Sequence, residues 1–168
     1  MKVELDNRYQ TEAYEEIQKS ISKTGKAGII LPTGTGKTYL ALKLIEDNLD
    51  KKQILYVSPS PTINARVRKL IRQIYNREEA KGILAKVKFV TYNGLSKRYK
   101  SHKEDMREYH SELIILDEVH RSGAKEWGKA VDYLLENNKE ARNIGNDSYT
   151  TSNRWTKYDR KKMWKSSL

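Results

Sequence analysis

Short apolar runs alternate with segments of helical periodicity along the first 137 residues. The apolar runs predict buried strands at Ala27–Leu31, Gln53–Ser58, Val87–Thr91 and Leu113–Leu116. Apolar residues spaced three or four apart predict helices at Tyr9–Ser22, Thr38–Leu49, Ile63–Tyr75 and Trp127–Asn137. Lys97–His110 is expected to be a charged surface segment with partial helix, and a weaker strand is expected at Ala141–Gly145. This alternation predicts an α/β fold with a parallel sheet covered on both faces.

The turn between the first predicted strand and the next helix has the composition of a phosphate-binding loop. Its expected nucleotide-binding residues are Thr33, Gly34, Thr35, Gly36, Lys37 and Thr38. Gly34 and Gly36 allow backbone N–H groups to face inward as an anion nest, and the helix dipole adds positive potential. Lys37 is expected to reach the β- and γ-phosphates, and Thr38 to ligate Mg²⁺. Leu31 stands where the general pattern has glycine, and the alternative is an ordinary turn rich in glycine and threonine.

An acidic motif, Asp117-Glu118-Val119-His120, directly follows the strand predicted at Leu113–Leu116. Ligands of open α/β sheets bind beyond the carboxyl ends of the strands. Asp117 is therefore expected to hold Mg²⁺, and Glu118 to accept a proton from the attacking water. The alternatives are a helix-start pair of acidic residues and, for His120, a capping or surface residue.

These two motifs resemble motifs I and II of the superfamily 2 helicases, in the Asp-Glu-x-His form. Residues 4 to 145 resemble the N-terminal RecA-like lobe of DEAD/DEAH-box helicases, nearest to DNA-type members such as the type III restriction Res subunit. The resemblance implies a P-loop NTPase fold, a three-layer sandwich around a mainly parallel sheet. It makes Lys37, Glu118 and His120 the catalytic residues, with His120 coupling the site to motif III and a second lobe. It also implies that Arg8 and Gln10 contact the adenine, for which an amide that both donates and accepts is suited.

Two further strand ends resemble helicase loops that contact the nucleic-acid backbone. Val57-Ser58-Pro59-Ser60 is similar to motif Ia, and Thr91-Tyr92-Asn93-Gly94-Leu95 to the next such motif. The residues that this resemblance assigns to nucleic acid are Ser58, Pro59, Thr91, Tyr92 and Asn93. The alternative is a pair of ordinary strand-to-helix turns. The basic residues Arg66, Arg68, Lys69 and Arg72 either extend this track or form a solvated helix face, which we favour.

Composition narrows the class of protein without deciding its function. The 168 residues fit one domain, and the net charge of +11 attracts polyanions, although solvated surface lysines explain it equally well. The chain has no cysteine, which excludes disulfide scaffolds and thiolate metal sites. It has neither a signal-peptide pattern nor an apolar run long enough to span a membrane, so a cytoplasmic protein without a membrane partner is expected.

The last 23 residues, 146–168, show neither helical nor strand periodicity. Related helicases have a Ser/Thr-Ala-Thr segment after the strand that follows motif II, and then a second lobe. Asn146–Thr151 can be encoded AAT GAC AGC TAC ACC A, and removing the first base gives ATG ACA GCT ACA CCA, or Met-Thr-Ala-Thr-Pro. We therefore expect residues 1–145 to be the ATP-binding lobe, with a sheet incomplete at its C-terminus. Residues 146–168 would be a basic tail translated out of frame in a truncated helicase, which the coding DNA would test.

The motifs together predict the ATP-binding lobe of an ATP-dependent DNA helicase or translocase. Its cofactors would be ATP and Mg²⁺, and its partners DNA rather than RNA and a second helicase lobe that a separate gene could encode. Hydrolysis by this fragment alone is expected to be weak, because the second lobe supplies the arginine fingers. Two alternatives stay open: a nucleotide-binding module without catalysis, and a small self-contained P-loop ATPase.

Overall fold

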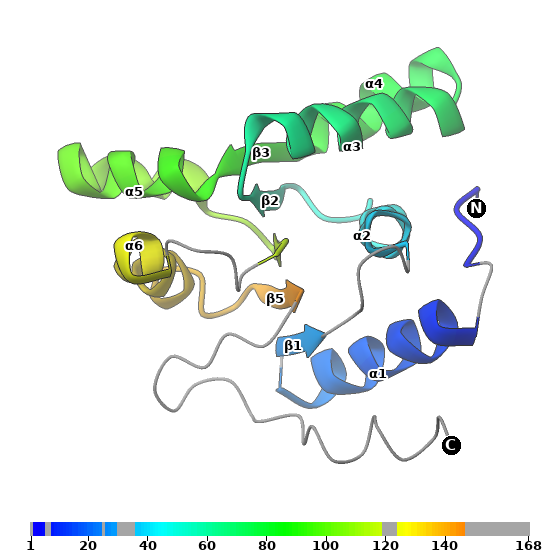
Figure 1. Ribbon diagram of the computed structural model, residues 1–168, viewed down its shortest axis with the longest axis horizontal. Helices are drawn as coiled ribbons and strands as arrows, with labels where there is room; N and C mark the ends of the chain where they lie inside the picture. The colour runs from blue at the N-terminus through cyan, green and yellow to red at the C-terminus, as the bar shows by residue number, and fades with distance from the viewer. Residues whose placement is uncertain (1, 6–7, 25, 30–35, 119–123, 147–168) are drawn as a thin grey trace.

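The computed structural model describes residues 2–5, 8–24, 26–29, 36–118 and 124–146, and Figure 1 shows their arrangement. The helices are α1 (Arg8–Thr24), α2 (Lys37–Glu46), α3 (Pro61–Ile74), α4 (Arg77–Lys86), α5 (Tyr92–Ser101), the 3₁₀ helix η1 (Lys103–Tyr109) and α6 (Ala124–Glu136). The strands are β1 (Lys26–Ile29), β2 (Ile54–Ser58), β3 (Val87–Thr91), β4 (Leu113–Leu116) and β5 (Arg142–Asn146). Each predicted strand and helix is present, with ends shifted by up to three residues where both ends are described.

The five described strands form one sheet in the order β1-β5-β4-β2-β3, and every neighbouring pair is parallel. This confirms the α/β fold with a mainly parallel sheet. The strand predicted weakly at Ala141–Gly145 lies between β1 and β4, with Ile144 opposite both Ala27 and Ile115. Because all strands run the same way, their carboxyl ends meet at one edge of the sheet, where ligands bind in folds of this class.

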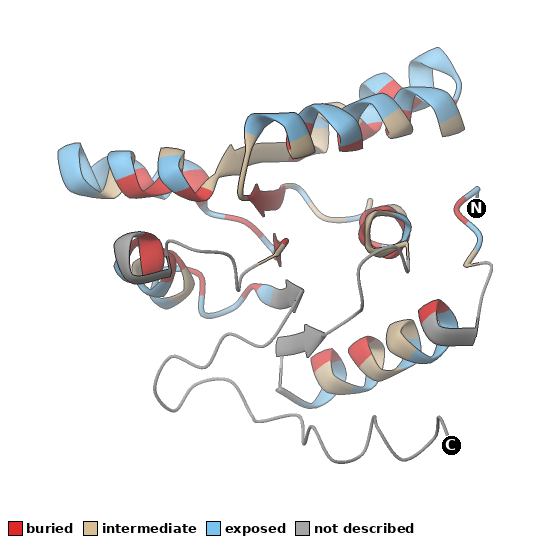
Figure 2. Ribbon diagram, in the orientation of Figure 1, coloured by how far each residue is buried: buried red, intermediate tan, exposed pale blue. Residues whose placement is uncertain are grey.

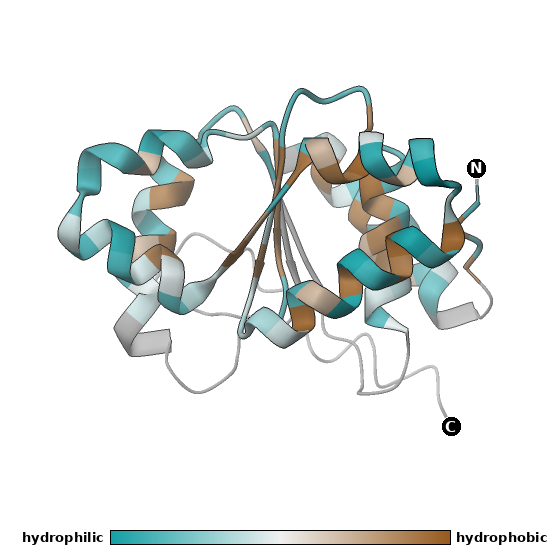
Figure 3. Ribbon diagram, turned by 90° about the horizontal axis from the view of Figure 1, so that it is seen from above, coloured by the Kyte–Doolittle hydropathy of each residue, from teal (hydrophilic) through white to brown (hydrophobic). Residues whose placement is uncertain are grey.

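The two faces of the sheet each carry a hydrophobic core, which gives the predicted three layers. Alternate residues of β2 point to opposite faces: Ile54 and Tyr56 join one cluster, and Leu55 and Val57 the other. The first cluster packs under α1 to α4, and the second under α5, η1 and α6. Figure 3 shows the sheet nearly edge-on between these two layers of helices. In Figure 2 the buried positions of the helices fall on the sides that face the sheet.

Two helices, α4 and α5, are not predicted by the hydrophobic pattern. In α4 two residues, Ala80 and Ile83, are buried, which is too few for a clear apolar stripe. Its start is instead marked by a capping box in which Asn76 and Glu79 exchange hydrogen bonds of 3.0 and 3.1 Å. The segment expected to be a charged surface with partial helix contains the end of α5 and all of η1, and η1 buries Met106 and Tyr109.

The solvent face of α3 is basic. Arg66, Arg68, Lys69 and Arg72 are all exposed, which agrees with a solvated helix face. The guanidinium carbon of Arg68 lies 4.6 Å from the ring centroid of Phe89 on the edge strand β3. Among the described helices, none combines the length and the apolar character needed to cross a bilayer.

The N-terminal segment is held to the end of α2 by one carboxylate. Glu46 accepts hydrogen bonds from the N–H of Lys2 at 2.6 Å and from the Tyr75 hydroxyl at 2.9 Å, and Lys43 lies 3.6 Å away. Burial opposes ionisation of Glu46, but the hydrogen bonds from Lys2, Tyr75 and Val3, together with the Lys43 charge, hold its pKa below the ordinary value. Glu46 is therefore expected to stabilise the fold in its charged form.

Glu46→Gln is expected to lower the free energy of unfolding at pH 7 by about 1.5–3 kcal/mol, the range for hydrogen bonds to a charged group. Because the folded-state pKa is lowered, this stabilisation is complete above the unfolded-state pKa of about 4.3 and is lost as the pH falls through the folded-state pKa. Thermal unfolding of both proteins from pH 7 to pH 3 measures the difference. A difference in the free energy of unfolding that stays constant over this pH range would contradict the prediction. The control is Glu104→Gln, at an exposed position, which should unfold with the same free energy as the unchanged protein at each pH.

Candidate functional site

The start of α2 is built around a glycine in a left-handed conformation. Gly36, directly before α2, has φ 79° and ψ 30°, which residues with a Cβ rarely adopt. A Cβ on Gly36 would also lie 2.0 Å from Nε2 of Gln10, a residue of α1 that is 4% exposed. The left-handed backbone therefore favours glycine here, and a larger residue would also displace the end of the Gln10 side chain. The structure thus brings together two predicted nucleotide-binding residues, Gln10 and Gly36.

Lys37 and Thr38 occupy the first turn of α2 and are half-buried. The six residues Leu40 to Ile45 that follow are all buried, which fixes the helix against the sheet. The carbonyl of Gly36 accepts hydrogen bonds from the N–H groups of Tyr39 and Leu40, at 2.9 and 3.2 Å. Lys37 therefore stands at the positive end of the helix dipole, and a lysine at this position favours bound phosphate.

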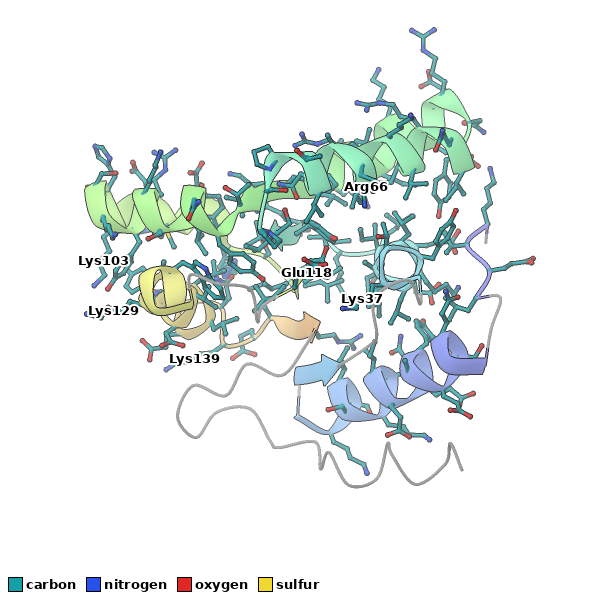
Figure 4. The ribbon with its side chains drawn as sticks, viewed as in Figure 1. Lys37, Arg66, Lys103, Glu118, Lys129 and Lys139 are labelled. Atoms are coloured by element: carbon teal, nitrogen blue, oxygen red, sulfur yellow. The ribbon has the colours of Figure 1, made fainter. Side chains whose placement is uncertain are left out.

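The acidic pair lies where β4 ends. The N–H of Asp117 donates to the carbonyl of Val57 at 2.8 Å, which continues the ladder between β4 and β2 by one residue. Asp117 is 7% exposed. Glu118 follows with φ 48°, a left-handed conformation that costs a non-glycine residue about 1–2 kcal/mol. Figure 4 labels Glu118 and Lys37 near the centre of the view, and the parallel sheet puts the segments that carry them at the same carboxyl edge.

A buried tyrosine orients the Asp117 carboxylate. The Tyr56 hydroxyl, on β2, donates to Oδ2 of Asp117 at 2.5 Å. Burial and the neighbouring Asp117 charge raise the pKa of Tyr56 well above its ordinary value, so the phenol keeps its proton and remains a donor. Sequence reasoning missed this residue. The available signal was a phenol inside a fully apolar strand, since a buried tyrosine hydroxyl usually finds a partner.

A second tyrosine holds the backbone of the same aspartate. The Tyr92 hydroxyl donates to the Asp117 carbonyl at 2.9 Å, and its ring stacks on Trp127 with centroids 4.2 Å apart. Tyr92 is 2% exposed. The resemblance assigned Tyr92 to nucleic acid, whereas the structure shows its side chain directed into the protein, toward the acidic pair.

The remaining residues assigned to nucleic acid differ in their exposure. Ser58 is fully buried, and its hydroxyl donates to Oδ1 of Asn64 at 2.8 Å. Pro59 and Thr91 are half-buried, and Asn93 is exposed. Thr91 caps α5 by accepting a hydrogen bond from the N–H of Gly94 at 3.0 Å. Thr33, Gly34, Thr35, His120 and the side chain of Arg8 lie outside the described residues.

The family of this lobe follows from a comparison with known proteins. The profile of the family described as "Type III restriction enzyme, res subunit" matches residues 4–145. The chain belongs to this family. Its residues 4–145 are thus a superfamily 2 helicase-type N-terminal lobe with a RecA-like fold, as the resemblance implied.

One curated relative agrees with this class of protein. The chain is 26% identical over 153 residues to "Putative helicase 7" of Sulfolobus islandicus filamentous virus (isolate Iceland/Hveragerdi). The alignment covers 80% of this chain and 24% of the relative, so the chain spans about a quarter of the relative's length.

Helicase-type lobes of the res-subunit family use ATP and Mg²⁺, and the donor set at the carboxyl edge fits both. Mg²⁺ commonly takes one or two carboxylates and fills its remaining positions with phosphate oxygens and water. A buried, oriented Asp117 is suited to that task, and the dipole and ammonium at the start of α2 are suited to the triphosphate. Gly36, with its φ of 79°, allows the tight backbone turn that a phosphate cradle requires.

Proposed function

We propose that this lobe binds Mg²⁺·ATP at the carboxyl edge of its sheet and, with a second lobe, couples ATP hydrolysis to movement along DNA. The observation that carries the proposal is the convergence of two separate elements. The Gly36–Lys37 turn at the start of α2 and the Asp117–Glu118 pair after β4 lie at the same edge. The residues proposed to bind phosphate and the residue proposed to activate water must act on the same nucleotide, and this edge brings them together.

Each residue of the proposed site has a task that its position supports. Lys37 would neutralise the β- and γ-phosphates, and Thr38 and Asp117 would ligate Mg²⁺, which polarises the γ-phosphate when bound. Glu118 would orient the attacking water and accept its proton. Gln10, on α1, lies beside Gly36, a position from which it could also contact the base. Arg8 and His120 remain assigned by resemblance.

The nucleic-acid contacts are proposed at the two strand ends after β2 and β3. Pro59, Thr91 and Asn93 offer accessible groups there, whereas the Ser58 and Tyr92 side chains are buried. Ser58 and Tyr92 would therefore contribute through their backbone atoms. Backbone N–H groups and helix N-termini are common partners of phosphate oxygens, and α3 and α5 both begin at these turns.

Lys37→Ala is expected to weaken binding of a fluorescent ADP analogue with Mg²⁺ by about 10- to 100-fold. The variant removes a charge-assisted hydrogen bond to phosphate, worth about 1.5–3 kcal/mol. Fluorescence anisotropy measures the dissociation constant. Lys129→Ala, at an exposed position of α6 on the other side of the molecule, is the matched control and should bind like the unchanged protein. Equal affinity of the Lys37 variant and the control would refute the proposed phosphate site.

A further inference from the structure

Asp117 is held by two tyrosine hydroxyls that come from opposite faces of the sheet. Tyr56 belongs to the cluster under α1 to α4, and its hydroxyl contacts the carboxylate at 2.5 Å. Tyr92 belongs to the cluster under α5 and α6, and its hydroxyl contacts the carbonyl oxygen at 2.9 Å. The side chain and the backbone of one residue are therefore positioned by separate layers of the fold.

The Tyr92 hydroxyl is held in place by the packing of its ring. The ring is buried and lies nearly parallel to the indole of Trp127, with an interplanar angle of 20°. Trp127 is 4% exposed and belongs to the same cluster as Leu95 and Met106. On the other side, the N–H of Asp117 is bonded to β2. The position of the Asp117 carbonyl is thus fixed by contacts on both sides.

Fixing that carbonyl also fixes the start of Glu118. The carbonyl of Asp117 and the N–H of Glu118 belong to one planar peptide unit, so they turn together. The unusual φ of Glu118, 48°, is the rotation about its N–Cα bond, which starts from the nitrogen of this peptide unit. A rotation of the peptide would therefore displace the Glu118 side chain, which the proposed function assigns to the attacking water.

Tyr92 is the first residue of α5 and belongs to the turn that is proposed to face nucleic acid. Its neighbours in sequence are Thr91, half-buried at the end of β3, and Asn93, exposed in the first turn of α5. A contact at either neighbour acts on the backbone that carries the Tyr92 ring. The hydroxyl at the other end of the ring donates to the carbonyl of Asp117. One side chain thus joins the proposed nucleic-acid surface to the proposed ATP site.

We propose that Tyr92 is a positioning residue that couples nucleic-acid contact at Thr91 and Asn93 to the placement of Asp117, the proposed Mg²⁺ ligand, and of Glu118 after it. This inference rests on the proposed function. It assigns to the strand-end turn after β3 a regulatory task in addition to contact. Tyr56 positions the carboxylate of Asp117 but is not part of this coupling. It reaches Asp117 from β2 and from the hydrophobic cluster under α1 to α4, on the opposite face of the sheet from the cluster that contains Tyr92.

The test compares the affinity for a fluorescent, non-hydrolysable ATP analogue with Mg²⁺ in the presence and absence of a single-stranded thymidine oligonucleotide. In the unchanged chain the oligonucleotide is expected to change the dissociation constant by about fivefold or more, the usual range for coupled sites. Tyr92→Phe keeps the ring and removes the hydroxyl. In this variant the dissociation constants with and without the oligonucleotide are expected to differ by no more than about twofold. Its affinity for each ligand alone should stay within about twofold of the unchanged chain.

Three further variants separate positioning from general damage. Tyr99→Phe, on the same helix with its ring against Tyr133, should leave every value unchanged. Tyr56→Phe should retain the coupling but need more Mg²⁺ for half-maximal analogue binding. If Tyr92→Phe does not fold, Trp127→Phe is tested instead. This variant keeps the Tyr92 hydroxyl but weakens the stacking of the Tyr92 ring, so it should reduce the coupling.

The outcomes distinguish this inference from the proposed function. If the unchanged chain does not bind the analogue with Mg²⁺, the proposed function fails. If the chain binds both ligands independently, or if Tyr92→Phe retains the full coupling, the inference fails and the nucleotide site stands. Loss of coupling in Tyr92→Phe with both separate affinities retained supports the inference.

Discussion

Glu118→Gln is expected to lower the single-turnover rate of ATP hydrolysis by about a hundredfold or more, while the affinity for Mg²⁺·ATP stays nearly unchanged. General base catalysis contributes about 10²- to 10⁴-fold, and the amide has the same shape as the carboxylate but cannot take up the proton. Because this lobe alone is expected to be slow, the assay uses an excess of protein over labelled ATP. The released phosphate is then followed over one turnover.

Two variants serve as controls for the Glu118 prediction. Glu104→Gln, at an exposed position in η1, should hydrolyse ATP at the unchanged rate. Glu118→Gly should lose hydrolysis as Glu118→Gln does, but should be about 1 kcal/mol more stable than that variant, because glycine adopts φ 48° without strain. Hydrolysis that persists in both Glu118 variants would exclude this residue as the base. If the unchanged chain gives no turnover above the buffer rate, the non-catalytic binding module becomes the better reading.

Trp127→Ala is expected to cost about 3–5 kcal/mol of stability, the range for deleting a large buried aromatic side chain. Trp127 is 4% exposed, stacks on Tyr92 and packs in the core under α6. A domain of this size is stable by about 5–15 kcal/mol in total, so the variant should lose a large share of its stability. Equilibrium unfolding in urea measures the change in free energy.

The control for Trp127 is an aromatic residue on the surface. Tyr39, in α2, is 43% exposed, and Tyr39→Ala should change the free energy of unfolding by no more than about 0.5 kcal/mol. Similar losses in the two variants would mean that the Trp127 contacts do not stabilise the core as the structure indicates.

The strands and most helices could be predicted because their buried positions are occupied by apolar residues, which produces a regular hydrophobic pattern in the sequence. Leu113 to Leu116 is buried on both faces and is accordingly an unbroken apolar run. Helix α4 was missed because its apolar stripe is short, although the Asn76 and Glu79 capping signal was readable. The position of β5 in the sheet could not be predicted from Arg142–Asn146 alone, since strand order depends on contacts between distant segments.

The site was predictable as far as its motifs are local. Gly36 and Lys37 follow a strand and open a helix, and the left-handed Gly36 agrees with what a tight phosphate turn requires. The tyrosine contacts were not predictable, because Tyr56 lies within β2 while Tyr92 and Asp117 follow β3 and β4, and only the folded sheet brings these three strands together. The direction of the Tyr92 ring depends on the stack with Trp127, a residue 35 positions away.

The place of β5 constrains the order in which this lobe can assemble. β1 pairs with β5, and β5 pairs with β4, so among the described strands β1 has no partner until β5 is present. Lys26 lies opposite Asn143, so that pairing closes a loop of more than 100 residues, a slow step in folding. During synthesis, β2, β3 and β4 can pair while β1 and its phosphate turn wait for residues 142–146 to leave the ribosome. The nucleotide site is therefore expected to be among the last parts of the lobe to form.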